Sequence, residues 1–164
     1  MIDFTLNLEK GMKELSSSGA FLTVNGNDKV NIMTISWGFV GFMWNKPVFI
    51  TVVRPQRYTK EIFDNNANSF TISVPFDGKL KEALKICGTE SGRDIDKSEI
   101  VKFTPAKTIT SPIVNGCDLY YECKLHTSQP LDGTLLPLDI VKQFYEDDFH
   151  YLYWGEIVEC YGAG

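Results

Sequence analysis

The sequence lacks several features that would place it in a large functional class. Its formal net charge is −5, so the excess of basic residues that is common in nucleic-acid-binding domains is missing. None of its four cysteines forms a C-x-x-C pair, and its two histidines are far apart, so no zinc-site spacing is present. No G-x-G-x-x-G motif follows the first expected strand. A nucleic-acid partner, a metal site and a Rossmann nucleotide-binding domain are therefore not expected.

Long hydrophobic runs are missing too. The longest apolar stretch, residues 48–53, is interrupted by Thr51 and is far too short to span a bilayer. The first residues contain no basic stretch followed by an apolar segment, so no secretory signal is visible. We expect a cytoplasmic protein with reduced thiols and no membrane partner.

The composition is that of a globular protein. Hydrophobic residues make up 43% of the 164 residues and charged residues 23%. No linker, repeat or low-complexity tract divides the chain, so residues 1–164 are expected to form a single domain. A domain of this length buries roughly 70% of the surface that its unfolded chain exposes, which leaves room for a real core.

Strand signals outnumber helix signals. Strands rich in β-branched and aromatic residues are expected at residues 20–24, 30–36, 39–42, 48–53, 69–74, 108–114, 119–126 and 151–159. Shorter helices are expected at residues 8–15, 58–65 and 79–86, with Thr59 as a possible N-cap and Gly88 closing the third. The apolar run at residues 48–53 suggests burial on both faces. Strands joined by tight turns, such as residues 25–28, favour an antiparallel barrel over a doubly wound sheet.

Residues 31–37 (NIMTISW) combine an apolar strand with polar donors. At a barrel opening, their backbone groups and hydroxyls could bind a planar heterocycle against an apolar wall. An isoalloxazine ring needs donors near N1, O2 and O4 and an acceptor near N3, which fits this description. Trp37 could equally be a buried core residue, and Asn31 could merely end the turn. The candidate ring-binding residues are Asn31, Met33, Thr34, Ile35, Ser36 and Trp37.

Residues 54–59 (RPQRYT) form a positive island in an acidic chain. Guanidinium groups match phosphate oxygens with charge-assisted hydrogen bonds, and a helix that begins here would point unpaired N–H groups at an anion. Each arginine alone could simply pair with a surface carboxylate, but the whole run favours a phosphate. The two segments together predict a site for flavin mononucleotide (FMN). The candidate residues of this second segment are Arg54, Arg57, Tyr58 and Thr59.

Three further residues are weaker candidates. No base neighbours Cys87 in the sequence, and a helix end just after it would raise the pKa of its thiol, so a packed or pocket-lining cysteine is favoured over a nucleophile. His150 could lie near the ring and deliver a proton, although a structural role is favoured. Lys97 belongs to a polar loop that could cover a ligand or could simply be solvated.

Five segments carry a resemblance to a known family. They are residues 31–37, residues 44–47 (WNKP), residues 54–59, residues 87–94 (CGTESGRD) with Asp96 and Lys97, and residues 153–157 (YWGEI). In this order and spacing, the chain resembles the flavin reductase-like family of FMN-binding split barrels, which includes the flavoredoxins.

The resemblance implies a Greek-key antiparallel split barrel, a homodimer, and FMN bound in a groove near the subunit interface. Residues 33–37 would face the isoalloxazine, Arg54, Arg57 and Thr59 the phosphate, and Lys97 the ligand from a covering loop. Cys87 matches a cysteine common in the closer relatives. Lys60 and Ser98 stand where relatives often have aromatic residues, which concerns the rim of the pocket more than the ring contacts.

The resemblance further implies an FMN-dependent oxidoreductase that accepts a hydride at flavin N5 from NADH or NADPH and passes electrons on. A flavoredoxin-type carrier, which would hold FMN and exchange electrons with a redox protein partner, needs the same contacts. A pyridoxamine phosphate oxidase-like enzyme and a non-catalytic flavin store are further alternatives. The sequence does not separate the reductase from the carrier.

Overall fold

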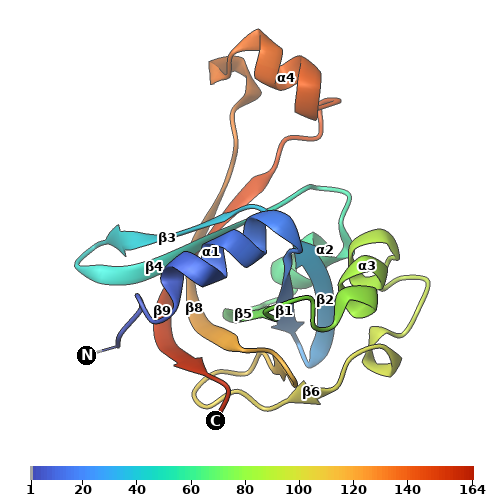
Figure 1. Ribbon diagram of the computed structural model, residues 1–164. Helices are drawn as coiled ribbons and strands as arrows, with labels where there is room; N and C mark the ends of the chain where they lie inside the picture. The colour runs from blue at the N-terminus through green and yellow to red at the C-terminus, as the bar shows by residue number, and fades with distance from the viewer. Residues whose placement is uncertain (1) are drawn as a thin grey trace.

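Antiparallel strands make up most of the structure, a computed structural model that describes residues 2–164 (Figure 1). Seven strands form one sheet in the order β2-β1-β5-β8-β9-β4-β3, and β6 and β7 form a second, small sheet. The strands are β1 (Ala20–Gly26), β2 (Lys29–Ile35), β3 (Gly38–Met43), β4 (Lys46–Val53), β5 (Ser69–Val74), β6 (Phe103–Thr104), β7 (Ile113–Val114), β8 (Leu119–Pro130) and β9 (Tyr151–Gly162). The helices are α1 (Leu8–Ser17), α2 (Tyr58–Asp64), α3 (Lys81–Thr89) and α4 (Leu138–Phe144), with 3₁₀ turns η1 (Lys97–Glu99) and η2 (Gly133–Leu135). The predicted antiparallel fold is confirmed, and the arrangement is that of a split barrel.

Two tight turns set the register of the outer hairpins. In β1–β2, Gly26 pairs with Lys29, and the two residues between them, Asn27 and Asp28, both have positive φ. Two central residues with positive φ match the right-handed twist of the flanking strands, and asparagine and aspartate tolerate this conformation. The turn predicted at residues 25–28 is therefore confirmed. The β3–β4 hairpin uses the same device, with Trp44 and Asn45 at positive φ.

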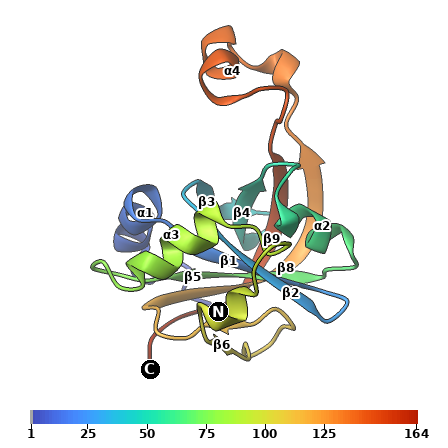
Figure 2. The same ribbon diagram turned by 90° about the vertical axis from the view of Figure 1, so that its right-hand side faces the viewer.

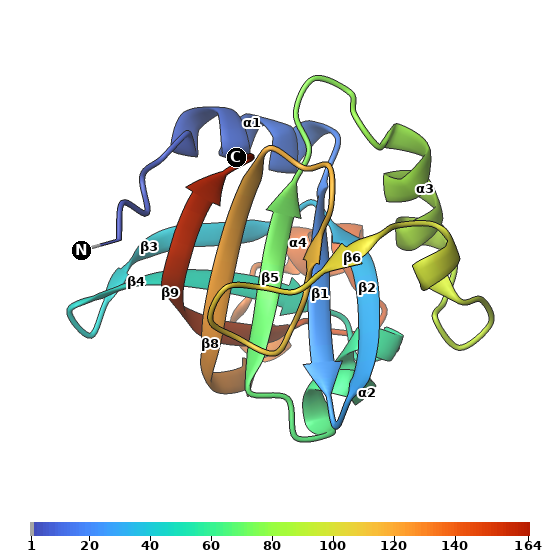
Figure 3. The same cartoon turned by 90° about the horizontal axis from the view of Figure 1, so that it is seen from below.

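The inner strands are buried on both faces. In β1, Leu22 belongs to the larger hydrophobic cluster, whereas its neighbour Phe21 belongs to a second cluster with Leu84 of α3. Every position of β5 is buried as well. In β4, Ile50 and Val52 remain partly exposed, so the predicted burial of this strand on both faces is wrong. Figure 3 shows β5, β8 and β9 running side by side, with β3 and β4 crossing behind them.

The predicted strand at residues 108–114 is mostly a loop. Only its last two residues form β7, which pairs with β6. The rest is held by the fully buried carboxylate of Glu122, which accepts hydrogen bonds from the backbone N–H of Lys107 (2.7 Å) and of Thr108 (3.0 Å). The Thr108 hydroxyl donates a third bond to Glu122 at 2.9 Å. A side chain therefore takes the place of a strand ladder here, which β-propensity cannot reveal.

Two predicted helix ends also differ from the structure. Arg57, not Thr59, precedes the first residue of α2, and Thr59 lies inside the helix. The third helix, α3, continues through Gly88 to Thr89, so Gly88 does not close it. Both shifts matter for function, because Thr59 within α2 and Gly88 within α3 line the same pocket.

Strands β8 and β9 continue beyond the body of the barrel and carry an arm, residues 131–150. Figures 1 and 2 show this arm, with η2 and α4, projecting well away from the sheet. Helix α4 has no buried residue. No helix within residues 2–164 is both long and apolar enough to cross a bilayer.

Candidate functional site

Three adjoining pockets run from the ends of β2 and β4 to the loop that follows α3. The inner pocket has a volume of about 360 Å³, the middle pocket about 190 Å³ and the outer pocket about 500 Å³. Met33 and Arg57 line both the inner and the middle pocket. Asn31, Tyr58 and Lys97 are among the residues that line both the middle and the outer pocket. The three therefore form one continuous row.

The inner pocket gathers the segment predicted to bind the ring. It is lined by Met33, Thr34, Ile35, Ser36, Trp37, Val52, Arg54, Arg57 and His150. Met33 and Ile35 are buried and give the pocket an apolar wall. The Thr34 hydroxyl donates a 2.6 Å hydrogen bond to the carbonyl of Leu84, so it fixes β2 to α3.

Strand β2 is an edge of the large sheet, which leaves one side of its backbone without a strand partner. The carbonyl of Ile32 faces this open side, because it accepts a hydrogen bond from Lys97 rather than from β1. Backbone groups that face one side recur at every second residue of a strand, so those of Thr34 face the same side. The edge therefore offers both donors and acceptors to a ligand in the inner pocket.

Trp37 borders the inner pocket and is 45% exposed, so its interpretation as a buried core residue is wrong. Its ring meets that of Phe144 edge-on at 5.6 Å between centroids, and that of His150 at 5.3 Å. The side chain therefore joins the end of β2 to the arm. This position gives the inner pocket an aromatic border.

Arg57 supplies the positive charge at the junction of the inner and middle pockets. Its guanidinium nitrogens lie 3.5 Å from the carbonyl oxygens of Cys87 and Gly88, and burial lowers the pKa of the group. Within residues 2–164, Arg57 forms no salt bridge with a carboxylate. A desolvated guanidinium without a counter-ion is costly, and an anionic ligand would offset that cost.

Lys97 brings a second buried cation to the middle pocket. Its side chain is only 5% exposed, and Nζ donates hydrogen bonds to the carbonyls of Ile32 (2.9 Å) and Cys87 (3.2 Å). Burial lowers the pKa of its ammonium group, and Arg57 adds to that effect. In the described part of the chain, Lys97 also lacks a salt bridge. Of the two alternatives for Lys97, the solvated loop is wrong, because the side chain is a buried anchor between η1 and β2.

A polar pair completes the middle pocket. The Asn31 amide donates a 2.9 Å hydrogen bond to the hydroxyl of Thr59, and both side chains are buried. Because a hydroxyl has one proton and two lone pairs, Thr59 can still donate to a ligand. Asn31 lies within β2 rather than at the end of the turn, so the alternative that it merely ends the turn is wrong. Gly92 closes over this pair, and a Cβ at that position would overlap the Asn31 amide.

Arg54 lines the inner pocket, but its charge is already matched. Its guanidinium forms a 2.9 Å ion pair with Asp148 and donates to the Phe144 carbonyl at 2.9 Å, both in the arm. It also lies over the Tyr145 ring. The predicted pairing of Arg54 and Arg57 on one phosphate is therefore not visible, and Arg54 instead fastens the arm to the barrel.

Cys87 and His150 lie in different surroundings. The Cys87 side chain is fully buried in the second hydrophobic cluster, and burial raises the pKa of its thiol. Only its carbonyl reaches the site, which speaks against a nucleophile. His150 lines the inner pocket, and its Nδ1 lies 2.7 Å from the Tyr145 hydroxyl. Burial, aided by Arg54, lowers the pKa of His150 to about 4, so its ring is neutral at neutral pH.

The sequence analysis missed Arg93, which lines the middle and outer pockets. Arg93 lies over the Tyr58 ring at 4.9 Å and pairs with Glu61. It stands within the segment at residues 87–94 that carries part of the family resemblance, so that segment was a usable signal. Nothing in the sequence pointed to Tyr145, which lines none of the three pockets but contacts His150 and Arg54 from the arm.

Comparisons with known proteins identify the family of this fold. Residues 12–163 match the family model described as flavin reductase like domain. Flavoredoxin from Methanosarcina acetivorans is 26% identical with a TM-score of 0.67, over 88% of this chain and 68% of that chain. An FMN-binding protein from Thermus thermophilus is 24% identical with a TM-score of 0.68, over 87% of this chain and 68% of that one.

Two further proteins are similar to this chain. An NADH:FAD oxidoreductase from Streptomyces globisporus has a TM-score of 0.66 at 16% identity, over 88% of this chain and 75% of that one. An uncharacterised protein of Archaeoglobus fulgidus is 27% identical over 132 residues, which are 79% of this chain and 73% of that protein. Because the family model matches nearly the whole chain, this protein belongs to the flavin reductase-like family.

Proposed function

We propose that the protein is an FMN-dependent oxidoreductase that takes a hydride from NADH or NADPH and passes electrons on. The observation that carries this proposal is a pair of cations, the half-buried Arg57 and the buried Lys97, which have no carboxylate partner within residues 2–164 and lie beside a pocket with an apolar wall. Their donor set fits a phosphate, and the neighbouring pocket fits a planar ring.

The phosphate of FMN would lie in the middle pocket. Arg57 and Lys97 provide charge-assisted hydrogen bonds, and Thr59 provides a hydroxyl donor held in place by Asn31. Helix α2 has seven residues, so side chains rather than the helix end supply the attraction. The middle pocket, at about 190 Å³, has room for a phosphate and the end of its ribityl chain.

The isoalloxazine would lie in the inner pocket against Met33 and Ile35. The open edge of β2 gives hydrogen-bonding groups to the polar rim of the ring, and Trp37 borders it. When bound, flavin supplies hydride acceptance at N5, a reaction for which no side-chain acid or base is required. His150 is neutral at neutral pH and can hold a proton on one ring nitrogen beside the pocket.

The proposed function has two versions, a reductase with a nicotinamide as hydride donor and an electron carrier. The relative in Streptomyces globisporus is named as an NADH:FAD oxidoreductase, which favours a nicotinamide donor. The relative in Methanosarcina acetivorans is named as a flavoredoxin, which favours an electron carrier with a redox protein partner. The reductase and the carrier would both use a bound flavin. They differ in the electron donor, which is a nicotinamide for the reductase and a redox protein for the carrier.

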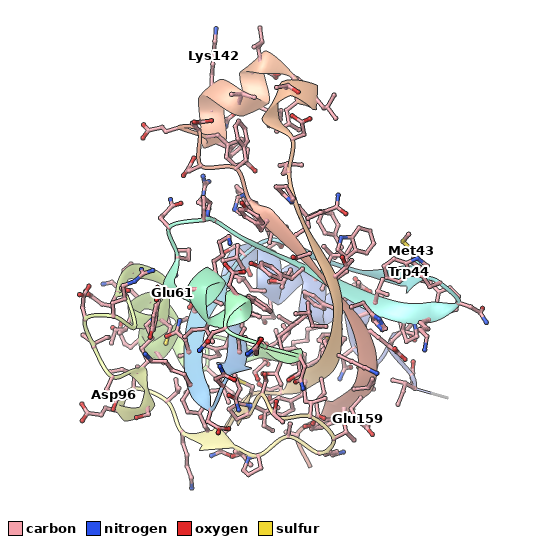
Figure 4. All side chains as sticks on the ribbon, turned by 180° about the vertical axis from the view of Figure 1, so that it is seen from behind. Met43, Trp44, Glu61, Asp96, Lys142 and Glu159 are labelled. Atoms are coloured by element: carbon pink, nitrogen blue, oxygen red, sulfur yellow. The ribbon has the colours of Figure 1, made fainter. Side chains whose placement is uncertain are left out.

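We also propose a homodimer. Five large hydrophobic side chains of the β3–β4 hairpin and the turn before it are 42–61% exposed, namely Trp37, Phe39, Phe42, Met43 and Trp44. Figure 4 shows Met43 and Trp44 at the free end of this hairpin, with the arm on another side of the molecule. On the arm, Leu135 and Leu138 are exposed as well. Exposed apolar groups of this size are typical of subunit contacts. The four cysteines are free, which supports a reducing, cytoplasmic location.

Anaerobic titration tests the proposal. The protein is loaded with FMN, and the visible absorbance band of the oxidised flavin is followed after addition of NADH or NADPH. Prompt bleaching supports the reductase, whereas bleaching only by a reduced protein donor supports the carrier. A protein that fails to bind FMN at saturating concentration would rule out both.

A further inference from the structure

A tyrosine and a histidine meet at the base of the arm, beside the inner pocket. The Tyr145 hydroxyl lies 2.7 Å from Nδ1 of His150, and the His150 ring lines the inner pocket. His150 is buried, and Trp37 packs against its ring at 5.3 Å between centroids. Tyr145 itself lines none of the three pockets. Tyr145 can therefore influence a bound ligand only by acting through His150.

A tight turn brings Tyr145 back onto His150. The Asp148 carboxylate accepts a hydrogen bond from the backbone N–H of Glu146 at 2.8 Å and forms a 2.9 Å ion pair with Arg54. The bond from Glu146 and the contact with Arg54 contribute to lowering the pKa of Asp148 to about 2, so its carboxylate is ionised at neutral pH. The turn is thus fastened to the barrel by a charge that persists at neutral pH.

Two neighbours hold the Tyr145 ring. The Arg54 guanidinium lies over the ring, with its central carbon 5.0 Å from the centroid, and the Phe149 ring packs at 4.7 Å between centroids. Phe149 in turn packs against Gly133 of η2, where a Cβ would overlap the Phe149 ring. A side chain that is already fixed in this way offers its hydroxyl at one position without a further loss of conformational entropy.

The contact between Tyr145 and His150 decides which nitrogen of the imidazole carries the proton. Burial, aided by Arg54, lowers the pKa of His150 to about 4, and burial raises the pKa of the Tyr145 phenol, so both groups are neutral at neutral pH. Within residues 2–164, the Tyr145 hydroxyl has no other hydrogen-bond partner. A proton on Nδ1 would leave the phenolic O–H without an acceptor in this part of the chain. Both groups are satisfied when the phenol donates to Nδ1 and His150 carries its proton on Nε2.

We propose that Tyr145 is a positioning residue, which holds His150 as its Nε2–H tautomer and so makes it a hydrogen-bond donor to the ring bound in the inner pocket. This inference rests on the proposed function, because that ring is the isoalloxazine. No hydrogen bond within residues 2–164 engages Nε2, so this nitrogen is the one left for a ligand. A fixed donor binds the reduced ring more tightly than the oxidised one, since reduction adds negative charge to the polar rim of the ring.

The first test reads the tautomer and needs no flavin. Protein with ¹⁵N-labelled histidine is studied at neutral pH by NMR, through the two-bond couplings between ring protons and nitrogens, and His150→Gln separates the signals of His150 from those of His126. We expect the wild type to carry the His150 proton on Nε2. Tyr145→Phe keeps the aromatic ring and loses the hydroxyl, so the ratio of Nε2–H to Nδ1–H should fall about 5-fold, as loss of one hydrogen bond would give.

The second test compares the dissociation constants of oxidised and reduced FMN. Tyr145→Phe should raise the constant of reduced FMN about 5-fold more than that of oxidised FMN. An anaerobic redox titration should then show a midpoint potential lower by about 20 mV, the equivalent of this ratio for a two-electron couple.

Tyr151→Phe is the matched control for both tests. The Tyr151 ring lies against Lys60 and lines none of the three pockets. This variant also loses one phenolic hydroxyl from a half-buried tyrosine, at the start of β9. It should keep the tautomer of His150 and the midpoint potential of the wild type.

The outcomes separate the inference from the function on which it rests. A wild-type His150 with its proton on Nδ1 overturns the inference, and so does a tautomer ratio that is unchanged in Tyr145→Phe. A changed ratio without a change in the midpoint potential also overturns it, because Nε2–H would then not reach the ring. Failure of the wild type to bind FMN overturns the proposed function, and it is distinguishable because the tautomer is measured without flavin.

Discussion

Lys97 and Arg57 donate to the same acceptor, the backbone carbonyl of Cys87, at 3.2 Å and 3.5 Å respectively. Two like charges are thus held next to each other by one helix end, and burial lowers the pKa of each. Such an arrangement costs free energy in the absence of a ligand, because neither charge is paired or well solvated. Sites of this kind are common where an anion is bound.

Replacing Arg57 by alanine should weaken FMN by about 10-fold or more, the loss expected for hydrogen bonds between charged groups. Riboflavin, which has no phosphate, should lose much less. Titration of both ligands by fluorescence quenching measures the difference. An equal loss for both would remove Arg57 from phosphate binding and assign it to the ring or to the shape of the pocket.

Gly92→Ala should disturb the middle pocket, because the new Cβ would overlap the Asn31 amide and approach the Tyr58 ring to 3.0 Å. We expect FMN affinity to fall by about 10-fold as the loop moves away. The matched control is Gly41→Ala in β3, where a Cβ meets nothing within 4 Å. If both variants bind FMN alike, close approach of the loop is unimportant.

Cys87→Ser should leave turnover nearly intact, since the thiol is buried in a hydrophobic cluster and only the carbonyl faces the site. The buried hydroxyl should lower the free energy of unfolding by about 1–2 kcal/mol. Cys87→Ala is the companion that removes the polar atom. Loss of turnover in Cys87→Ser with FMN still bound and the fold intact would restore a chemical role for the thiol.

We predict that the His150 environment makes the folded protein less stable at mildly acidic pH. Its pKa is about 4 in the folded protein, against an ordinary value of about 6.5. Between these two values the ring is protonated in the unfolded chain but neutral in the folded protein. The free energy of unfolding should therefore fall by about 2–3 kcal/mol between pH 6.5 and 4. Urea denaturation at pH 6.5 and pH 4 measures this change for the wild type and His150→Gln. A slope that survives in the variant would place its origin elsewhere.

Glu122→Gln should destabilise the loop that replaces the predicted strand. The buried carboxylate accepts bonds from two backbone N–H groups, the Thr108 hydroxyl and the Tyr161 hydroxyl, and an amide would turn an N–H₂ toward one of these donors. We expect a loss of about 2–4 kcal/mol. Thermal unfolding of this variant against the exposed control Glu82→Gln tests it, and similar melting temperatures would contradict it.

Local sequence patterns predicted much of the fold. The turn at Asn27 and Asp28 needed only residues that tolerate positive φ, and the approximate ends of most strands followed from runs of β-branched and aromatic residues. The prediction was wrong at residues 108–114, where Glu122 from another strand satisfies the backbone. For Lys97, only the alternative of a solvated loop is wrong, because the side chain is buried. In both cases the deciding contact comes from a different secondary-structure element, which local sequence patterns do not reveal.

The sequence by itself determined the antiparallel class of the fold and the segments that carry the site, because side-chain periodicity and turn chemistry act over a few residues. Only the tertiary structure decided the partner of each charge. It assigned Arg54 to Asp148 of the arm, left Arg57 and Lys97 without a counter-ion among residues 2–164, and opened a third pocket beyond them. Charge pairing depends on distances of a few ångströms between segments that the chain brings together only on folding.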